Sequence, residues 1–406
     1  MPNSEPIKHP FSDLLILELA SVLAGPGVGQ FFAELGARVI KIENPGTNGD
    51  VTRKWKLSTE APETDRPAYF TSANWGKESL AVDIRKPQGL KIIEQLATIA
   101  DVVIASYKPG DAKKLGVSYQ QLSAINPKLV YGDITGYGPN VNRAGYDAVV
   151  QAESGFMHLN GQPDSPPTKM PVALIDILAG HQLKEGILAA LYMREKTGLG
   201  DYVQVSLINS AIASLANQAA NYLVAGHNPR RIGSEHPNIA PYGTLYTTKD
   251  NLQITLAVGD DRQFASLCQI LNVPGLALEP RFLTNAARVK HRDELSALLQ
   301  QAIAGVELQP LLTRLIKAHV PAGAVNDVAT VLSDPAHQNQ LLQAENKEHF
   351  AYAGLRSVVF ESGKASSKIN MTPPPRFSEH SAQILAGLLH LSEQEIENLR
   401  AGKVIA

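Results

Sequence analysis

Short apolar runs alternate with longer amphipathic stretches over the first 135 residues of the chain. Five runs have the length and composition of buried strands: 14–19, 38–43, 79–83, 101–105 and 129–134. Three stretches between them repeat apolar residues at helical spacing: 26–35, 88–99 and 118–125. Strands that alternate with helices are joined by right-handed crossovers into a mainly parallel sheet covered on both faces. The pattern therefore predicts an α/β fold.

The pattern changes after residue 225. Residues 244–247 and 253–257 read as a hairpin, and helical spacing follows at 262–271, 292–303 and 308–319. Farther on, 357–360 reads as a strand, and 379–389 and 392–399 read as helices. We therefore expect a large α/β domain that begins with residues 1–225 and a small α+β domain at 226–330. Residues 331–406 are expected to form a linker and a part that returns to the large domain.

Asp176 lies where an apolar stretch ends and a long helical pattern begins, and that pattern closes at Lys196-Thr-Gly198. A carboxylate at the N-terminal end of a helix accepts free backbone N–H groups and lies in the positive end of the helix dipole, which keeps it ionised and oriented. Two interpretations fit this position, a helix cap and a nucleophile. Position by itself favours the cap.

Composition narrows the function classes. With 406 residues, 44% of them hydrophobic, the chain can bury a large core, and its length suggests two or three domains. A net charge of -2 argues against binding to nucleic acid or to a membrane surface, because both partners select a basic excess. One cysteine excludes internal disulfides, and residues 1–10 carry no targeting pattern, so we expect a cytoplasmic protein.

The common cofactor motifs are missing from the sequence. The first predicted turn reads Ser21-Val-Leu-Ala-Gly-Pro-Gly27, which lacks G-x-G-x-x-G and carries a proline where that loop needs a backbone N–H. There is no phosphate-binding P-loop and no G-x-S-x-G elbow, and the 11 histidines are scattered. We therefore expect no nicotinamide cofactor, no permanently bound cofactor and no metal.

Several fragments, taken in order, carry a resemblance to a known family. They are the segments 23–27, 36–46, 108–110, 135–138, 145–152, 196–200, 236–238 and 320–323, together with Asp176. In this order and spacing the chain resembles the family III CoA-transferases, which include formyl-CoA transferase, carnitine CoA-transferase and α-methylacyl-CoA racemase. The resemblance implies a Rossmann-like large domain and an interlocked homodimer, with crossing linkers near 200–225 and 325–350.

The resemblance also implies a role for Asp176. In this family an aspartate attacks the thioester of an acyl-CoA, giving an aspartyl-acyl anhydride and then an aspartyl-CoA thioester. A carboxylate suits this step because an anhydride keeps the acyl group activated. Acyl-CoA is then a substrate and not a resident cofactor.

The CoA contacts that the resemblance implies lie along the carboxyl edge of the predicted sheet. They are Leu23, Ala24, Asn74, Lys77, Tyr107, Lys108, Lys114 and Tyr137. Lysine side chains there suit phosphates as point charges, although a single lysine in a loop is more often simply solvated. The chain departs from formyl-CoA transferase at Asn44, where that enzyme has an arginine, and at Ser106, where it has an asparagine. CoA contacts at these two positions are therefore in doubt.

Substrate choice is less clearly encoded. The segment 233–247 lacks the glycine run that handles oxalate in formyl-CoA transferase. Tyr146 stands where the racemases have a catalytic histidine, and its ordinary pKa near 10 suits proton transfer poorly. The segment 236–242 is most similar to transferases that use succinyl-CoA and a dicarboxylate. Arg230, Arg231 and His236 are candidates to bind the distal carboxylate of the acid, and each is equally compatible with a surface or turn role.

Three functions remain open from the sequence. The first is a CoA-transferase that moves CoA from a donor, expected to be succinyl-CoA, to a dicarboxylic acid through Asp176, with formyl-CoA:oxalate transfer as a variant of it. The second is an α-methylacyl-CoA racemase or isomerase that uses Asp176 as a base. The third is a non-catalytic protein that binds acyl-CoA.

Overall fold

The computed structural model of the chain describes residues 9–345, 351–361 and 371–406. Most of the segment 1–10, in which we expect no targeting pattern, lies outside this described part. The chain divides into two compact units. The first comprises the described residues of Met1–Ser154, Pro171–Ala216 and Asn339–Ala406, and the second comprises Gly155–Met170 and Asn217–Gln338. The domain limits at residues 225 and 330 stay a prediction.

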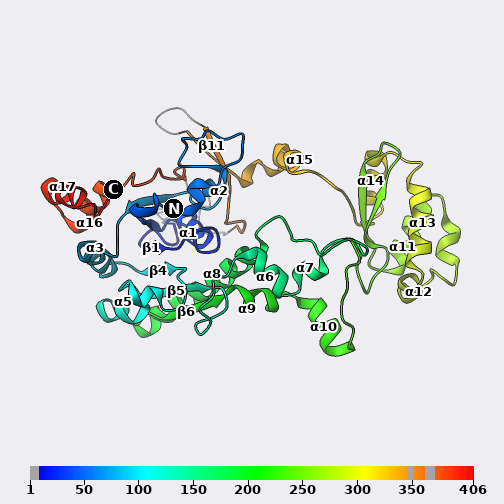
Figure 1. Ribbon diagram of the computed structural model, residues 1–406. Coiled ribbons are helices and arrows are strands. Elements are labelled where there is room, and N and C mark those ends of the chain that lie inside the picture. The colour runs from blue at the N-terminus through cyan, green and yellow to red at the C-terminus, as the bar shows by residue number, and fades with distance from the viewer. Residues whose placement is uncertain (1–8, 346–350, 362–370) are drawn as a thin grey trace, which may run out of the picture. The chain divides into compact units, whose positions relative to one another are not determined.

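A six-stranded sheet forms the centre of the first unit (Figure 1). Its strands are β1 (Leu15–Leu19), β2 (Arg38–Glu43), β3 (Lys77–Ala81), β4 (Val102–Ala105), β5 (Val130–Thr135) and β6 (Tyr202–Ser206). The order is β3-β2-β1-β4-β5-β6, and every neighbouring pair is parallel. The five strands expected from the sequence and their parallel arrangement are confirmed. This order places the reversal of strand order between β1 and β4.

The sixth strand was not expected, because it lies within the segment 200–225 that we predicted as a crossing linker. β6 pairs only with β5 at the edge of the sheet, and four of its five residues are half-buried. An edge strand of this kind has no continuous apolar run, so its sequence pattern is weak. The linker prediction for residues 202–206 is therefore wrong.

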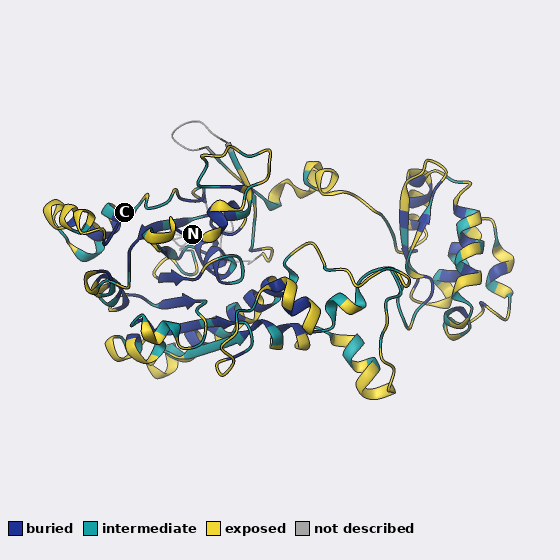
Figure 2. Cartoon of the chain, in the orientation of Figure 1, coloured by how far each residue is buried: buried dark blue, intermediate teal, exposed yellow. Residues whose placement is uncertain are grey.

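Helices cover both faces of the sheet. One face carries α1 (Ala24–Glu34) and α8 (Leu174–Thr197), which pack against each other. The other carries α3 (Pro87–Ala97), α5 (Tyr119–Ile125), α16 (Ser381–Leu389) and α17 (Glu393–Ala401), whose apolar residues share one core cluster with β1. Figure 2 shows the strands buried and the outer helix faces exposed. The C-terminal helices thus pack in the core of the large unit.

Shorter elements complete the first unit. They are α2 (Ala68–Thr71), α4 (Asp111–Lys114), α6 (Asp147–Glu153), α9 (Leu207–Ala213) and the 3₁₀ turns η1 (Pro45–Thr47) and η2 (Val51–Lys54). β10 (Leu341–Glu345) pairs with β11 (Ala351–Leu355) in an antiparallel ribbon.

The strand predicted at 357–360 is wrong. There the N–H groups of Ser357 and Val358 donate to Glu34 Oε2 at 2.7 and 3.1 Å, so a carboxylate satisfies them in place of a neighbouring strand.

The second unit is built on a three-stranded antiparallel sheet of β7 (Tyr242–Thr247), β8 (Gln253–Ala257) and β9 (Ala322–Ala324). Its core is packed by α11 (Asp261–Ile270), η3 (Pro274–Leu278), α13 (Arg292–Ile303) and α14 (Leu308–Lys317). The expected hairpin and helices are confirmed. The remaining elements of the chain are α7 (Phe156–Leu159), α10 (Ala216–Ala225), α12 (Asn285–Lys290), α15 (Val328–Ser333) and η4 (Pro335–Gln340).

The second linker predicted by resemblance, 325–350, contains α15, η4 and β10, and its residues 346–350 lie outside the described part. Among the described helices none is long and apolar enough to cross a membrane. The cytoplasmic location stays a prediction.

Candidate active site

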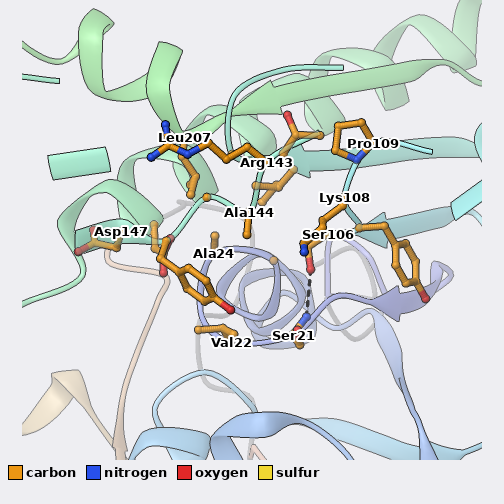
Figure 3. Close-up of a pocket in the computed structure, with 18 residues that line it drawn as sticks. Ser21, Val22, Ala24, Ser106, Lys108, Pro109, Arg143, Ala144, Asp147 and Leu207 are labelled. Atoms are coloured by element: carbon orange, nitrogen blue, oxygen red, sulfur yellow. Dashed lines mark hydrogen bonds between the residues drawn. The ribbon is translucent and has the colours of Figure 1, made fainter. Parts of the chain in front are cut away.

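A cavity of about 200 Å³ opens at the carboxyl edge of the sheet, where the strand order reverses between β1 and β4 (Figure 3). Its lining comes from residues 21, 22, 24 and 25 after β1, 106–109 after β4, 134–136 at the end of β5 and 143–147, with Asp176 and Leu207. The backbone N–H of Ser21 donates to Ser106 Oγ at 3.2 Å and joins the first two segments. Ligands of open parallel sheets bind at this type of crevice.

Asp176 is the third residue of α8 and lies in the first turn of that helix. The N-cap position belongs to Ala173, so Asp176 is not the cap residue that its position in the sequence favoured. The side chain lines the cavity while the residue is only 8% exposed. A buried carboxylate that reaches a cavity suits a reacting group better than a solvated cap.

A second carboxylate holds the start of α8. Asp147 begins α6, its Oδ1 accepts a hydrogen bond from the N–H of Ile175 at 2.8 Å, and its Oδ2 accepts one from Gln151 Nε2 at 2.7 Å. Burial, together with the negative charge of Asp147, raises the pKa of Asp176 to about 7. Near neutral pH the carboxyl group of Asp176 therefore exchanges readily between its acid and its ionised form.

The N-terminal end of α1 faces the same cavity through Ala24 and Gly25. The first N–H groups of a helix have no partner within it, so these two peptide groups are potential donors to a negatively charged oxygen. α8 passes close by, because a Cβ atom on Gly180 would lie 3.2 Å from Ala24 O. The fold thus brings a carboxylate and a helix N-terminus to one cavity.

Two cationic side chains, Lys108 and Arg143, also line the cavity. Arg143 Nη2 forms an ion pair with Glu153 Oε1 at 2.6 Å, and its guanidinium lies over the ring of Tyr137 at 4.6 Å. Lys108 is exposed and also lines an adjoining cavity of about 210 Å³ that includes Tyr131. Lys108 thus presents a positive charge at the boundary of two cavities.

A larger cavity of about 480 Å³ lies beside the first and shares Ser21 and Tyr107 with it. Asn44, Lys54 and Arg85 belong to its lining. Asn44 caps η1, since its Oδ1 accepts a hydrogen bond from Gly46 N at 2.8 Å. The two cavities together provide an elongated site with cationic side chains in both parts.

Four of the residues predicted from the sequence meet at the first cavity: Asp176, Ala24, Tyr107 and Lys108. Ser106, where a CoA contact was in doubt, lines it as well. Apart from Asp176, which lies in α8, these residues come from the turns after β1 and β4.

The other predicted CoA contacts lie elsewhere. Leu23 is the N-cap residue of α1, Lys114 lines a separate cavity and pairs with Asp111 at 2.9 Å, and Tyr137 donates to Glu153 Oε2 at 2.6 Å. Asn74 and Lys77 are buried, with Lys77 Nζ 2.9 Å from Asn74 Oδ1. None of these five appears in the lining of the first cavity, and their contact with CoA stays a prediction.

The three predicted acid-binding residues belong to the second unit. Arg230 is exposed, Arg231 Nη1 donates to His158 O at 3.0 Å, and His236 Nδ1 accepts a hydrogen bond from Asn238 N at 3.1 Å. Their role in binding the acid stays a prediction.

Two features were missed from the sequence. The first is Asp147, although the motif 145–152 contains it. The second is a group of buried charged side chains beneath the turn after β1. Glu18 and Lys41 interrupt the apolar strands β1 and β2, and both residues are almost completely buried. An ionisable residue within an apolar strand requires a buried partner, so this interruption is the signal that could have revealed the group.

Comparison with known proteins gives a consistent result. A model of CoA-transferase family III matches residues 11–381. The chain is 39% identical over 396 residues to the succinate–glutarate CoA-transferase of Agrobacterium fabrum, with 96% of this chain and 97% of that protein covered. It is 35% identical over 408 residues to the succinyl-CoA:glutarate CoA-transferase of Mus musculus, with 98% and 90% covered.

Another relative and a solved structure agree. The chain is 30% identical over 407 residues to the succinyl-CoA–D-citramalate CoA-transferase of Chloroflexus aurantiacus, with 99% of this chain and 100% of that protein covered. The crystal structure of a CAIB/BAIF family protein from Brucella suis superimposes with a TM-score of 0.81 and 40% sequence identity, and covers 94% of this chain and 100% of that one. The fold and the cavity of this chain agree with these matches, which show that the chain belongs to CoA-transferase family III.

Proposed function

We propose that the protein transfers CoA from succinyl-CoA to a dicarboxylic acid and that Asp176 is the nucleophile. The observation that carries this proposal is the placement of a buried carboxylate, with its pKa raised to about 7, in a cavity at the end of β1 and β4. The similarity to transferases named for succinyl-CoA with glutarate or D-citramalate supports the substrate classes.

The first half of the reaction releases succinate. A carboxylate oxygen of Asp176 attacks the thioester carbonyl, the C–S bond breaks, and CoA leaves as a thiolate with an aspartyl-succinyl anhydride behind it. The thiolate then attacks the aspartyl carbonyl, so that succinate departs and an aspartyl-CoA thioester forms. The acceptor carboxylate attacks the aspartyl-CoA carbonyl and expels the CoA thiolate, which leaves a second mixed anhydride. The thiolate then attacks the acceptor's own carbonyl in that anhydride, so the new acyl-CoA forms and Asp176 is released as a carboxylate.

Three features of the cavity suit this chemistry. Ala24 and Gly25 line the cavity at the first turn of α1, and their N–H groups are the proposed donors to the oxyanion that develops at each attack. Lys108 supplies a positive charge for a CoA phosphate or an incoming carboxylate. The adjoining cavity of about 480 Å³, with Lys54 and Arg85, offers room and charge for the nucleotide part of CoA.

The proposal extends to a homodimer of interlocked chains, which the resemblance implies. The exposed apolar residues of α10 support a protein partner for this helix, since Leu223 is 78% and Val224 87% exposed. Arg230, Arg231 and His236 are the proposed contacts of the distal carboxylate.

The racemase alternative has little support in the cavity. Tyr146, which stands where the racemases have a catalytic histidine, lines the cavity but is 61% exposed.

Acyl exchange measured by mass spectrometry tests the proposal. Succinyl-CoA is offered with glutarate, D-citramalate, oxalate or a monocarboxylic acid, and new acyl-CoA species are recorded for the wild type and for Asp176→Asn. We expect a dicarboxyl-CoA product that falls by at least about 10⁴-fold in the variant, as for other covalent nucleophiles. Solvent deuterium entering the α-carbon of an acyl-CoA without exchange would instead establish the isomerase, and undiminished exchange in the variant would remove Asp176 from the mechanism.

A further inference from the structure

The segment 20–26, which carries the turn after β1 into α1, is held by three buried charged side chains. Each binds one peptide group of the segment: Lys41 Nζ donates to Ala20 O at 3.0 Å, Asp50 accepts from the N–H of Val22, and Lys77 Nζ donates to Pro26 O at 2.9 Å. The three come from β2, from the loop before η2 and from β3. The segment is therefore fixed at its beginning, its middle and its end.

These three side chains form one continuous set of ion pairs with Glu18 of β1. Glu18 Oε1 lies 3.0 Å from Lys41 Nζ, Glu18 Oε2 lies 2.7 Å from Lys77 Nζ, and Asp50 Oδ2 lies 2.9 Å from Lys41 Nζ. No side chain of the four is more than 1% exposed. Burial lowers the pKa of Lys41, but Glu18 and Asp50 outweigh it and hold that pKa above its ordinary value. The four side chains thus depend on one another through these ion pairs.

Val22 is the unusual residue of the segment. Its φ is +73°, in the left-handed region that β-branched residues avoid because their side chain meets the backbone. The surrounding structure must enforce such a conformation. The N–H of Val22 itself lies 3.4 and 3.3 Å from the two oxygens of Asp50, which bind the peptide group of this residue directly. Asp50 is itself fixed by Lys41 and by Thr52, whose N–H donates to Oδ1 at 3.0 Å.

Val22 lines the cavity that contains Asp176, and the helix that presents Ala24 and Gly25 begins two residues later. The conformation of Val22 therefore sets the direction in which those N–H groups point. We propose that Asp50 is a positioning residue for the transfer reaction, because it holds Val22 in the left-handed conformation and so aims the start of α1 at the reacting carbonyl. This inference rests on the function proposed above.

The first test compares two isosteric variants. Asp50→Asn keeps Oδ1, which accepts from Thr52 and lies 3.4 Å from Val22 N. It turns Oδ2, the acceptor 3.3 Å from Val22 N, into an NH₂ group that faces Lys41 and cannot accept. Asp101→Asn is the matched control. Asp101 also joins a cation and a β1 peptide group, since Oδ1 lies 3.0 Å from Arg194 Nη1 and Oδ2 accepts from Leu15 N at 2.9 Å, at the opposite end of β1.

We expect Asp50→Asn to lower kcat by about 10²-fold relative to Asp101→Asn, the typical effect of a misplaced oxyanion donor. The loss should appear in kcat more than in KM, because the aimed N–H groups act on charge that develops during attack. Thermal unfolding of both variants separates this effect from lost stability. Equal losses of kcat in the two variants at matched stability would overturn the proposal.

A double-mutant cycle tests the role of Val22 itself. Glycine adopts a φ of +73° without steric conflict, so in a Val22→Gly background the conformation no longer depends on Asp50. We expect Asp50→Asn to cost at least threefold less in kcat in that background than in the wild type. The same cost in both backgrounds would show that Asp50 does not act through Val22.

Two further measurements keep the test decisive. If Asp50→Asn fails to fold, Thr52→Val removes only the hydroxyl that donates to Asp50 Oδ1 at 2.8 Å and keeps the ion pairs of the four side chains. A loss of kcat must then appear in Thr52→Val and shrink in the Val22→Gly background, and an unchanged kcat in Thr52→Val would overturn the proposal. If the wild type transfers no acyl group at all, the proposed function fails, and crystal structures of the two variants decide the positioning separately. A Val22 φ that leaves the positive region in Asp50→Asn but not in Asp101→Asn supports it, and a Val22 φ near +73° in both variants overturns it.

Discussion

Asp147 Oδ1 accepts a hydrogen bond from the backbone N–H of Ile175 at 2.8 Å, and Ile175 directly precedes Asp176 in α8. One carboxylate therefore fixes the start of the helix that carries the other. Its negative charge also adds to burial in raising the pKa of Asp176. Asp147 thus supports the start of the helix that carries the proposed nucleophile, and its charge adds to burial in raising the pKa of that nucleophile.

The rate of transfer should rise with pH through about 7, because only ionised Asp176 attacks a thioester and its pKa is raised to about 7. In Asp147→Asn the neighbouring charge is removed while an oxygen remains to accept from Ile175. The rising limb should therefore move to lower pH. The measurement is kcat/KM from pH 5 to 9 for both proteins, and an unmoved limb would show that Asp147 does not influence the ionisation of Asp176.

Asp176→Asn should be more stable than the wild type at pH 8. A folded-state pKa above the ordinary value means that ionisation of Asp176 opposes folding, so its favourable contribution is complete at low pH and is lost as the pH rises through about 7. The Tm of the variant should be several degrees higher at pH 8, at roughly 2–4 °C per kcal/mol, with little difference at pH 4. A lower Tm at pH 8 would contradict the assigned burial.

Two glycines of α1 should respond oppositely to alanine. A Cβ atom on Gly29 would lie 1.9 Å from Glu18 Oε2, whereas one on Gly27 would meet nothing within 4 Å. Gly29→Ala should destabilise the protein by about 1–3 kcal/mol or more, because the buried ion pairs cannot yield. Gly27→Ala should be neutral or stabilise by about 0.5–1 kcal/mol through helix propensity. Denaturant unfolding of the pair measures both, and equal effects would argue against the close approach of α1 to Glu18.

Lys108→Gln should weaken acyl-CoA binding. The side chain lines the cavity beside Asp176, so loss of its charge should raise KM for succinyl-CoA by about tenfold, which corresponds to about 1.4 kcal/mol, with kcat less affected. Lys91→Gln, an exposed lysine of α3, is the control and should leave KM unchanged. Steady-state kinetics at two salt concentrations would also show a weaker salt dependence in Lys108→Gln.

The protein should have twice the chain mass of 43.7 kDa in solution. The exposed apolar side chains of α10 and the family resemblance both favour a homodimer. Light scattering coupled to gel filtration measures the mass directly. A stable monomer at micromolar concentration would count against the interlocked arrangement.

The elements that depend on local periodicity could be predicted from the amino-acid sequence. Strands β1, β2, β4 and β5 are buried on both faces, so each appears in the sequence as an apolar run. Asp176 could be placed at the start of a helix because helical spacing of apolar residues follows it in the sequence. β6 escaped because an edge strand leaves a weaker pattern.

The tertiary structure alone decided which charges meet. Lys77 looks in the sequence like a loop cation for a phosphate, yet the strand order β3-β2-β1 buries it against Glu18, 59 positions earlier in the chain. The raised pKa of Asp176 likewise depends on burial and on Asp147, which belongs to a different helix. Periodicity reports how each residue faces its own element, whereas burial and ion pairing depend on contacts between residues that are distant in sequence, and these exist only after the sheet has assembled.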